Sequence, residues 1–274
     1  MFMKTRKKSI KNPARIMLAI GLSSLLLLGS LTAGADEADA KRLLKAMTDY
    51  VSAQKSISFD FDAVLDVVTP EDQVIGLASS GAVTLSRPDK IHASRSGGFS
   101  DIEMNFDGET LTILGKNLNA YTQVKIPGTV DHLIDELKDT YNRPLPAADL
   151  LLANSYEVLM QDVVDVKDLG SGVVGGIECD SLAFRAKEVD WQIWIAQGDR
   201  PYPCRYSITS KLVANSPQYS VQVRNWKTGD EVAARDFNFK NATDAKQVEM
   251  EDLKGTGDLP EIFKIVETDK GESK

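Results

Sequence analysis

Residues 58–67 read Ser-Phe-Asp-Phe-Asp-Ala-Val-Leu-Asp-Val and carry the clearest alternation of apolar and polar side chains in the sequence. Successive side chains of a β-strand point to opposite faces, so the alternation separates two faces. The apolar face consists of Phe59, Phe61, Ala63, Leu65 and Val67. The other, mostly polar face consists of Ser58, Asp60, Asp62, Val64 and Asp66. This pattern is typical of an antiparallel sheet that is buried on one side.

Further strands are expected along the chain, and turn signals separate one from the next. After a turn at 69–72, residues 74–86 predict a second long strand, in which Gly81 indicates a bend or bulge. The pair Asp107-Gly108 is a two-residue hairpin signal. The remaining strands are expected at 91–96, 101–106, 109–114, 119–125, 162–169, 177–186, 189–196, 204–213, 218–226 and 232–239.

Helical spacing of apolar residues replaces the alternation in two places. Residues 37–54 predict an amphipathic helix, and residues 129–141 predict a second one whose apolar face includes Leu133 and Leu137. A short third helix is expected to open at Pro146. Many strands with segregated helices predict an α+β, mostly β fold, and a sheet of about ten or eleven strands has to curl or close.

The amino-terminal residues have the three-part layout of a secretory signal peptide. A basic segment is followed by an apolar run over 16–28 and by the small residues around Ala33 and Ala35. The run is shorter than the roughly 20 residues that a membrane span needs, although an uncleaved signal anchor is the alternative. We therefore expect cleavage between Ala35 and Asp36, a periplasmic protein without a stable membrane anchor, one domain over 36–248, and a flexible charged tail over 249–274.

The charge balance excludes some classes of partner. The whole chain has 32 Lys and Arg against 40 Asp and Glu, for a formal charge of −8. The six charged residues of the leader are all basic, so its removal brings the charge to about −14. An acidic surface of this kind disfavours nucleic acid and anionic lipid headgroups as broad docking partners.

The chain has two cysteines, Cys179 and Cys204, and both follow the leader. In an oxidising compartment, an even pair is first interpreted as a disulfide. The expected meander, however, places them on either side of the strand 189–196, roughly 10 Å apart at two strand spacings. A disulfide needs about 4.4–6.8 Å between α-carbons, so the bridge requires strong local curvature.

Residues that could support catalysis or metal binding are few. The two histidines, His92 and His132, stand outside any catalytic or metal-binding motif, and we interpret both as structural or surface residues. Asp60, Asp62 and Asp66 could hold a calcium ion, but a solvated strand face is the better interpretation. We therefore expect no enzyme, no cofactor and no resident metal.

Several strings resemble a known bacterial family. They are Phe106-Asp-Gly-Glu-Thr-Leu-Thr-Ile113, Leu145-Pro-Ala-Ala-Asp-Leu-Leu151, Gly175-Gly-Ile-Glu-Cys-Asp-Ser-Leu-Ala-Phe-Arg185 and Val189-Asp-Trp-Gln-Ile-Trp-Ile195, the last running into Gly198-Asp-Arg-Pro201. Over residues of about 40–245 the chain resembles DUF2092, a family of predicted periplasmic proteins. That family is similar to the lipoprotein-carrier fold of LolA and LolB. The resemblance implies a half-open antiparallel barrel whose concave face is covered by helices, and it implies no motif-defined site.

This expected architecture indicates a carrier or binding protein for a hydrophobic ligand, such as an acyl chain of a lipid or lipoprotein. Burying one methylene contributes about 0.8 kcal/mol, so part of an acyl chain gives useful affinity. The alternative for each candidate lining residue is ordinary core packing. The candidates are Phe59, Phe61, Leu65, Met104, Phe106, Leu133, Leu137, Trp191 and Ile193.

A second function class remains open from the sequence. An envelope interaction or stress-sensing protein would act through protein–protein contacts at its acidic surface. Binding of that kind weakens with salt, whereas binding of an apolar ligand is nearly insensitive to salt.

Overall fold

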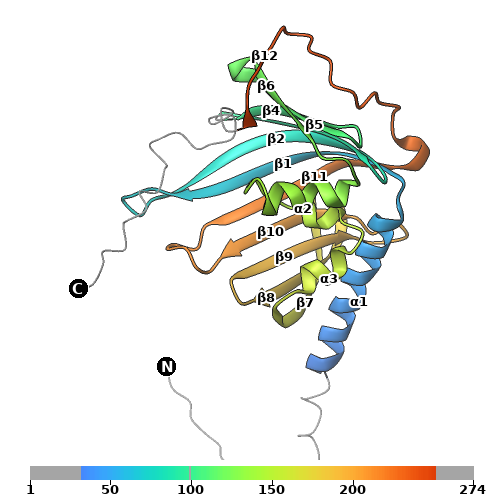
Figure 1. Ribbon diagram of the computed structural model, residues 1–274. Coiled ribbons are helices and arrows are strands. Elements are labelled where there is room, and N and C mark those ends of the chain that lie inside the picture. The colour runs from blue at the N-terminus through green and yellow to red at the C-terminus, as the bar shows by residue number, and fades with distance from the viewer. Residues whose placement is uncertain (1–31, 99, 251–274) are drawn as a thin grey trace, which may run out of the picture.

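The computed structural model describes residues 32–98 and 100–250 (Figure 1). Most of the expected leader and tail therefore lie outside the described residues. The helical segments are α1 (Thr32–Ala53), η1 (Lys116–Leu118), α2 (Val130–Asp139), η2 (Ala148–Leu151), α3 (Ser155–Met160) and η3 (Gly229–Glu231). None of the helices in the described part is long and apolar enough to cross a membrane.

All strands of the described chain belong to one sheet, which confirms the mostly β fold with a long, curved and unclosed antiparallel sheet (Figure 1). Its first half contains β1 (Ser56–Val68), β2 (Val74–Ser86), β3 (Lys90–Gly97), β4 (Asp101–Phe106), β5 (Thr110–Gly115) and β6 (Ala120–Lys125). Its second half contains β7 (Val163–Val174), β8 (Ile177–Ala186), β9 (Val189–Ala196), β10 (Pro203–Ser210) and β11 (Gln218–Thr228), and β12 (Lys246–Gln247) completes the sheet.

The two halves of the sheet are joined by the pairing of β1 with β11. The strand order is β12-β6-β5-β4-β3-β2-β1-β11-β10-β9-β8-β7. Since β11 lies between β1 and β10, neither of its edges is free to pair with a following strand. The predicted strand at 232–239 is therefore wrong. The chain instead crosses to the far edge of the sheet, where β12 pairs in parallel with β6.

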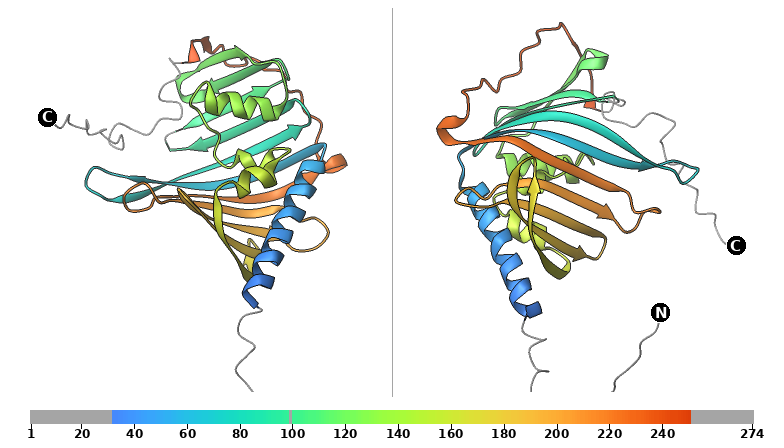
Figure 2. Two further views of the ribbon diagram at one scale, coloured as in Figure 1. Left: turned by 60° about the horizontal axis from the view of Figure 1, so that its bottom comes forward. Right: turned by 180° about the vertical axis from the view of Figure 1, so that it is seen from behind.

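The helices lie on the concave face of the sheet, as expected (Figure 2). Helix α2 begins after Thr129, whose Oγ1 accepts a hydrogen bond of 3.2 Å from the backbone N–H of His132. Its apolar face is buried against the sheet through Val130, Leu133, Ile134 and Leu137. Helix α1 buries its own apolar face through Ala40, Leu44, Met47 and Val51. The regular spacing of these residues is what made both helices predictable.

The two cysteines are free thiols in the structure, so the expected disulfide is not formed. Cys179 on β8 pairs with Ala196 on β9, and Cys204 occupies a register shift in β10 on the other side of β9. Their thiols are neighbours, since each affects the pKa of the other, but no bond joins them. Both thiols are buried with Ala196 in a small apolar cluster.

Candidate ligand-binding cavity

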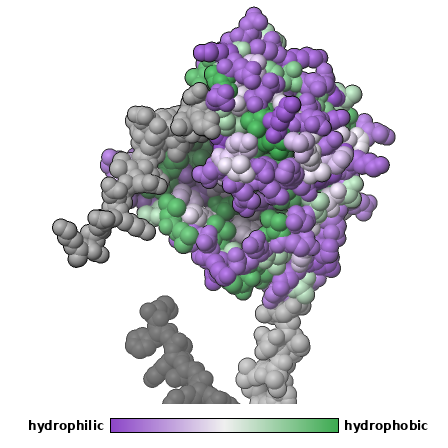
Figure 3. All heavy atoms as spheres, in the orientation of Figure 1, coloured by the Kyte–Doolittle hydropathy of each residue, from purple (hydrophilic) through white to green (hydrophobic). Residues whose placement is uncertain are grey.

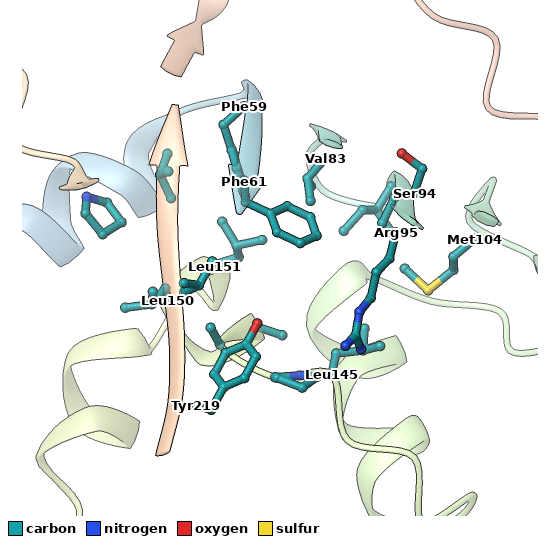
Figure 4. Close-up of a pocket in the computed structure, with 18 of the residues that line it drawn as sticks. Phe59, Phe61, Val83, Ser94, Arg95, Met104, Leu145, Leu150, Leu151 and Tyr219 are labelled. Atoms are coloured by element: carbon teal, nitrogen blue, oxygen red, sulfur yellow. The ribbon is translucent and has the colours of Figure 1, made fainter. Parts of the chain in front are cut away.

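A cavity of about 190 Å³ lies between the concave face of the sheet and the segment that connects α2 to α3 (Figure 4). Its floor consists of two rows of side chains that run across neighbouring strands. Strand pairing places Phe59, Val83, Ala93 and Met104 opposite one another in one row. Directly paired residues of a sheet share a face, so the row presents a continuous apolar surface.

The second row of the floor contains a glycine. Pairing connects Val223, Phe61, Gly81, Arg95 and Ile102 across five strands. A Cβ at Gly81 would lie 2.5 Å from the Cζ atom of Phe61 and would also clash with the backbone oxygen of Ser94. The absent side chain therefore lets the Phe61 ring lie over the backbone of β2. No register shift interrupts β2 at this position, so the expected bulge at Gly81 is wrong, and a close approach of the ring explains the glycine.

The roof of the cavity is made by the segment 145–151, which includes η2. Leu145, Leu150 and Leu151 from this segment face the floor (Figure 4). Ala147 precedes η2 with φ of 63°, a conformation that alanine adopts only at some energetic cost. The roof is thus a short irregular segment rather than a long helix.

An aromatic group lies at one end of the cavity. Trp226 lines the cavity and stacks on Phe59, with 5.5 Å between the ring centroids. Tyr202 stacks on Trp226 at 5.2 Å. Beyond these rings, Arg200 donates hydrogen bonds of 3.1 and 2.7 Å to the carboxylate of Glu231. This exposed pair joins the segment after β9 to η3.

The lining of the cavity is mostly apolar and includes the polar residues Ser94, Arg95 and Tyr219. Figure 4 shows the guanidinium of Arg95 and the hydroxyl of Tyr219 pointing into it. Burial raises the pKa of Tyr219, and the positive charge of Arg95 opposes part of that rise. On the outside, the view of Figure 3 is mostly hydrophilic, with hydrophobic residues gathered around a hollow in that face.

The candidate residues from the sequence fall into three environments. Phe59, Phe61 and Met104 line the cavity. A larger set is buried in the main core around it, namely Phe106, Leu133, Leu137, Trp191 and Ile193. Leu65 lies in a separate cluster with Val67 and Leu77, in the part of the β1–β2 hairpin that is more distant from the helices.

Buried aromatic packing explains why Trp191 belongs to the core. Its ring stacks on Phe184 with 3.8 Å between centroids and 7° between the planes. Tyr206 meets the same ring edge-on at 5.8 Å. This contact fills the concave face under β8–β10 with the protein's own side chains.

Arg95, Leu145, Tyr219 and Trp226 line the cavity but were not predicted from the sequence. The alternation of β11 could have placed Tyr219 and Val221 on one face. Nothing local, however, shows that β11 pairs with β1. Arg95 was missed because a charged residue in a short strand is normally interpreted as solvent-facing.

The carboxylates on the polar face of β1 have protein partners. Asp62 is paired with Arg224 at 2.6 Å, and its pKa is lowered by hydrogen bonds from Ser80 and Arg224. Asp60 accepts a hydrogen bond of 2.6 Å from the side chain of Asn225. No group of three or more metal-ligating side chains occurs in residues 32–98 and 100–250.

Comparison with solved structures gives several similar folds at low identity. LprF from Mycobacterium bovis is 10% identical, with a TM-score of 0.43, and the match covers 73% of this chain and 98% of that one. The lipoprotein LppX from Mycobacterium tuberculosis is 14% identical, with a TM-score of 0.36 and coverage of 69% and 96%. A LolA superfamily protein from Nitrosomonas europaea is 12% identical, with a TM-score of 0.30 and coverage of 70% and 94%.

At these identities the likeness concerns the fold and nothing further. No curated protein matches the chain in sequence. A family model does match, over residues 40–251, and its description is "Predicted periplasmic protein (DUF2092)". The match includes the strings that suggested the resemblance and spans every strand and helix except the start of α1. The chain therefore belongs to the DUF2092 family of predicted periplasmic proteins.

Proposed function

We propose that this protein is a periplasmic, non-enzymatic carrier or binding protein for a hydrophobic ligand, with the ligand's acyl chain in the cavity between the sheet and the 145–151 roof. The observation that carries the proposal is the apolar lining of this cavity, to which the sheet contributes Phe61 and the roof contributes Leu150. A leader-directed periplasmic location would give the protein access to lipids and lipoproteins of the envelope.

The size of the cavity limits what it accepts without rearrangement. An engineered apolar cavity of about 150 Å³ holds a benzene molecule, so a cavity of about 190 Å³ holds on the order of eight carbon atoms. Burying eight methylenes contributes about 6 kcal/mol before the cost of association is subtracted. A single chain segment therefore fits, whereas two chains require the roof to move.

Native mass spectrometry tests the proposal on protein purified from periplasm without detergent. We expect a discrete added mass that disappears after organic extraction and returns when a fatty acid is offered. The variant Ala93→Leu places a larger apolar side chain in the floor and should reduce uptake without unfolding the protein. A clean apo mass, with no uptake of offered fatty acid or phospholipid, would contradict the proposal.

A second candidate function is supported by one observation at the edge of the sheet. Strand β7 is an edge strand, and the β7–β8 hairpin exposes apolar side chains: Val164 (65% exposed), Leu169 (52%), Val173 (69%) and Ile177 (40%). An open edge with exposed apolar residues is suited to a protein contact. Introducing a positive charge at this apolar edge by Val173→Lys should abolish such a contact and leave acyl-chain binding unchanged.

A further inference from the structure

Arg95 places a positive charge inside a cavity whose lining is mostly apolar. It lies on β3 between Gly81 and Ile102 in the second floor row, and its guanidinium points toward Leu145 of the roof (Figure 4). Its Nε donates a hydrogen bond of 3.1 Å to the hydroxyl of Ser79. In the described part of the chain, no carboxylate lies within ion-pair distance of Arg95, so no described residue neutralises its charge.

A cation in apolar surroundings costs free energy unless an anion or several hydrogen bonds compensate it. Ser79 satisfies one of the five N–H groups of this side chain. The hydroxyl of Tyr219 also points into the cavity, and the opposing effect of Arg95 on its pKa shows that the two groups lie close enough to interact. Together, they form a polar end to an apolar space.

We propose that the ligand is a single-chain fatty-acid anion whose carboxylate is bound by the guanidinium of Arg95, with the hydroxyl of Tyr219 as a second donor. This inference rests on the proposed function and assigns the headgroup of its ligand. The planar guanidinium matches a carboxylate through two parallel hydrogen bonds, and charge-assisted bonds of this kind are stronger than neutral ones.

The single positive charge in the cavity favours a carboxylate over a phosphate monoester. Among the described residues that line the cavity, Arg95 is the only cation, so one negative charge is neutralised, whereas a phosphate monoester carries nearly two. The chain as a whole is acidic, at −8 with its leader included. Attraction to the surface therefore does not explain a preference for anions, and such a preference has to come from Arg95.

The experiment compares the binding of dodecanoate and 1-dodecanol by isothermal titration to the mature protein. The variants are Arg95→Met, which keeps the length of the side chain and removes the charge, and Arg185→Met as a control. Arg185 is an exposed arginine whose nearest carboxylate oxygen, on Asp190, is 3.9 Å away, and it does not line the cavity. Arg95→Lys serves as a second variant, because it keeps the positive charge. It allows the preference for dodecanoate to be measured even if Arg95→Met folds poorly.

We expect the wild type and Arg185→Met to bind dodecanoate roughly tenfold or more tightly than dodecanol. Arg95→Met should lose this preference while its affinity for dodecanol stays the same, and Arg95→Lys should keep part of it. Equal affinities in the wild type, or an undiminished preference in Arg95→Met, would overturn the inference. Binding of both compounds without preference leaves the proposed carrier function standing, whereas binding of neither contradicts both.

Discussion

Arg87 and Leu151 connect the sheet to the roof of the cavity: Nη2 of Arg87 donates a hydrogen bond of 2.6 Å to the backbone oxygen of Leu151. Arg87 directly follows β2, and the side chain of Leu151 lines the cavity. The same guanidinium lies 3.8 Å from a carboxylate oxygen of Asp131 on α2, and its side chain is only 15% exposed. The largely buried guanidinium of Arg87 thus joins the end of β2 both to α2 and to the 145–151 roof.

Replacing this cation should loosen the roof. Arg87→Met is expected to lower the free energy of unfolding by about 1.5–3 kcal/mol, the usual net contribution of a hydrogen bond to a charged group. Hydrogen exchange of residues 145–152 should accelerate more than exchange in β8–β10. Unchanged exchange in the roof would show that Arg87 does not hold it, and Arg185→Met provides the exposed control.

The close approach of Phe61 to Gly81 makes a second prediction. Gly81→Ala should destabilise the protein by about 1–3 kcal/mol through overpacking, and it should displace the Phe61 ring into the cavity. Gly98→Ala is the matched control, because a Cβ at Gly98 meets no atom within 4 Å. Chemical denaturation measures both variants, and equal midpoints for the two would contradict this account of Gly81.

The free energy of unfolding should depend on pH through the protonation of His92. Burial lowers the pKa of this histidine from 6.5, although the hydrogen bond of 3.1 Å to Glu103 opposes part of the change. The unfolded chain therefore takes up a proton at a higher pH than the folded protein does. Stability should be constant above about pH 7.5 and should fall as the pH decreases through 6.5 toward the lower pKa of the folded state.

Urea denaturation between pH 7.5 and pH 5.5 checks this dependence. His92→Gln keeps a hydrogen-bonding group beside Glu103 and removes the titration, so its midpoint should change less with pH than that of the wild type. His132→Gln, at the exposed side of α2, is the control and should keep the wild-type dependence. An identical slope for His92→Gln and the wild type would rule out His92 as the source.

The free thiols of Cys179 and Cys204 can be counted directly. Burial raises the pKa of both thiols, and the thiolate is the reactive form. Ellman's reagent should therefore react slowly with the native protein at pH 8 and should find two thiols in urea without reductant. Finding no thiol in the denatured, unreduced protein would mean that the two cysteines are bridged in solution.

The sequence predicted the local elements of this fold well, because each was encoded by neighbouring residues. The alternation around Phe59 and Phe61 placed both rings on the concave face, and the spacing of Leu133 and Leu137 predicted α2. The structure differed from the sequence-based prediction where strands pair that are distant in the chain. The pairing of Phe61 with Val223 joins strands that are far apart in the chain, and no local pattern encodes its register.

The candidate site was predictable only in part for the same reason. A face of a strand can be predicted from alternation, but which part of that face remains open depends on where the helices lie. Leu65 shares a face with Phe61 and still packs in another cluster, because the β1–β2 hairpin extends away from the helices. Arg95 became a candidate only when strand pairing placed it beside Gly81 and below the 145–151 roof.

Photo-crosslinking can show whether the cavity holds an acyl chain. A dodecanoate analogue with a diazirine near its methyl end is bound to the mature protein, irradiated, and mapped by peptide mass spectrometry. We expect labels in β1, β3 and the segment 145–151, and we expect unlabelled dodecanoate to reduce this labelling. Labels confined to the exposed residues of the β7–β8 hairpin, or labelling that dodecanoate does not reduce, would contradict binding of the acyl chain in the cavity.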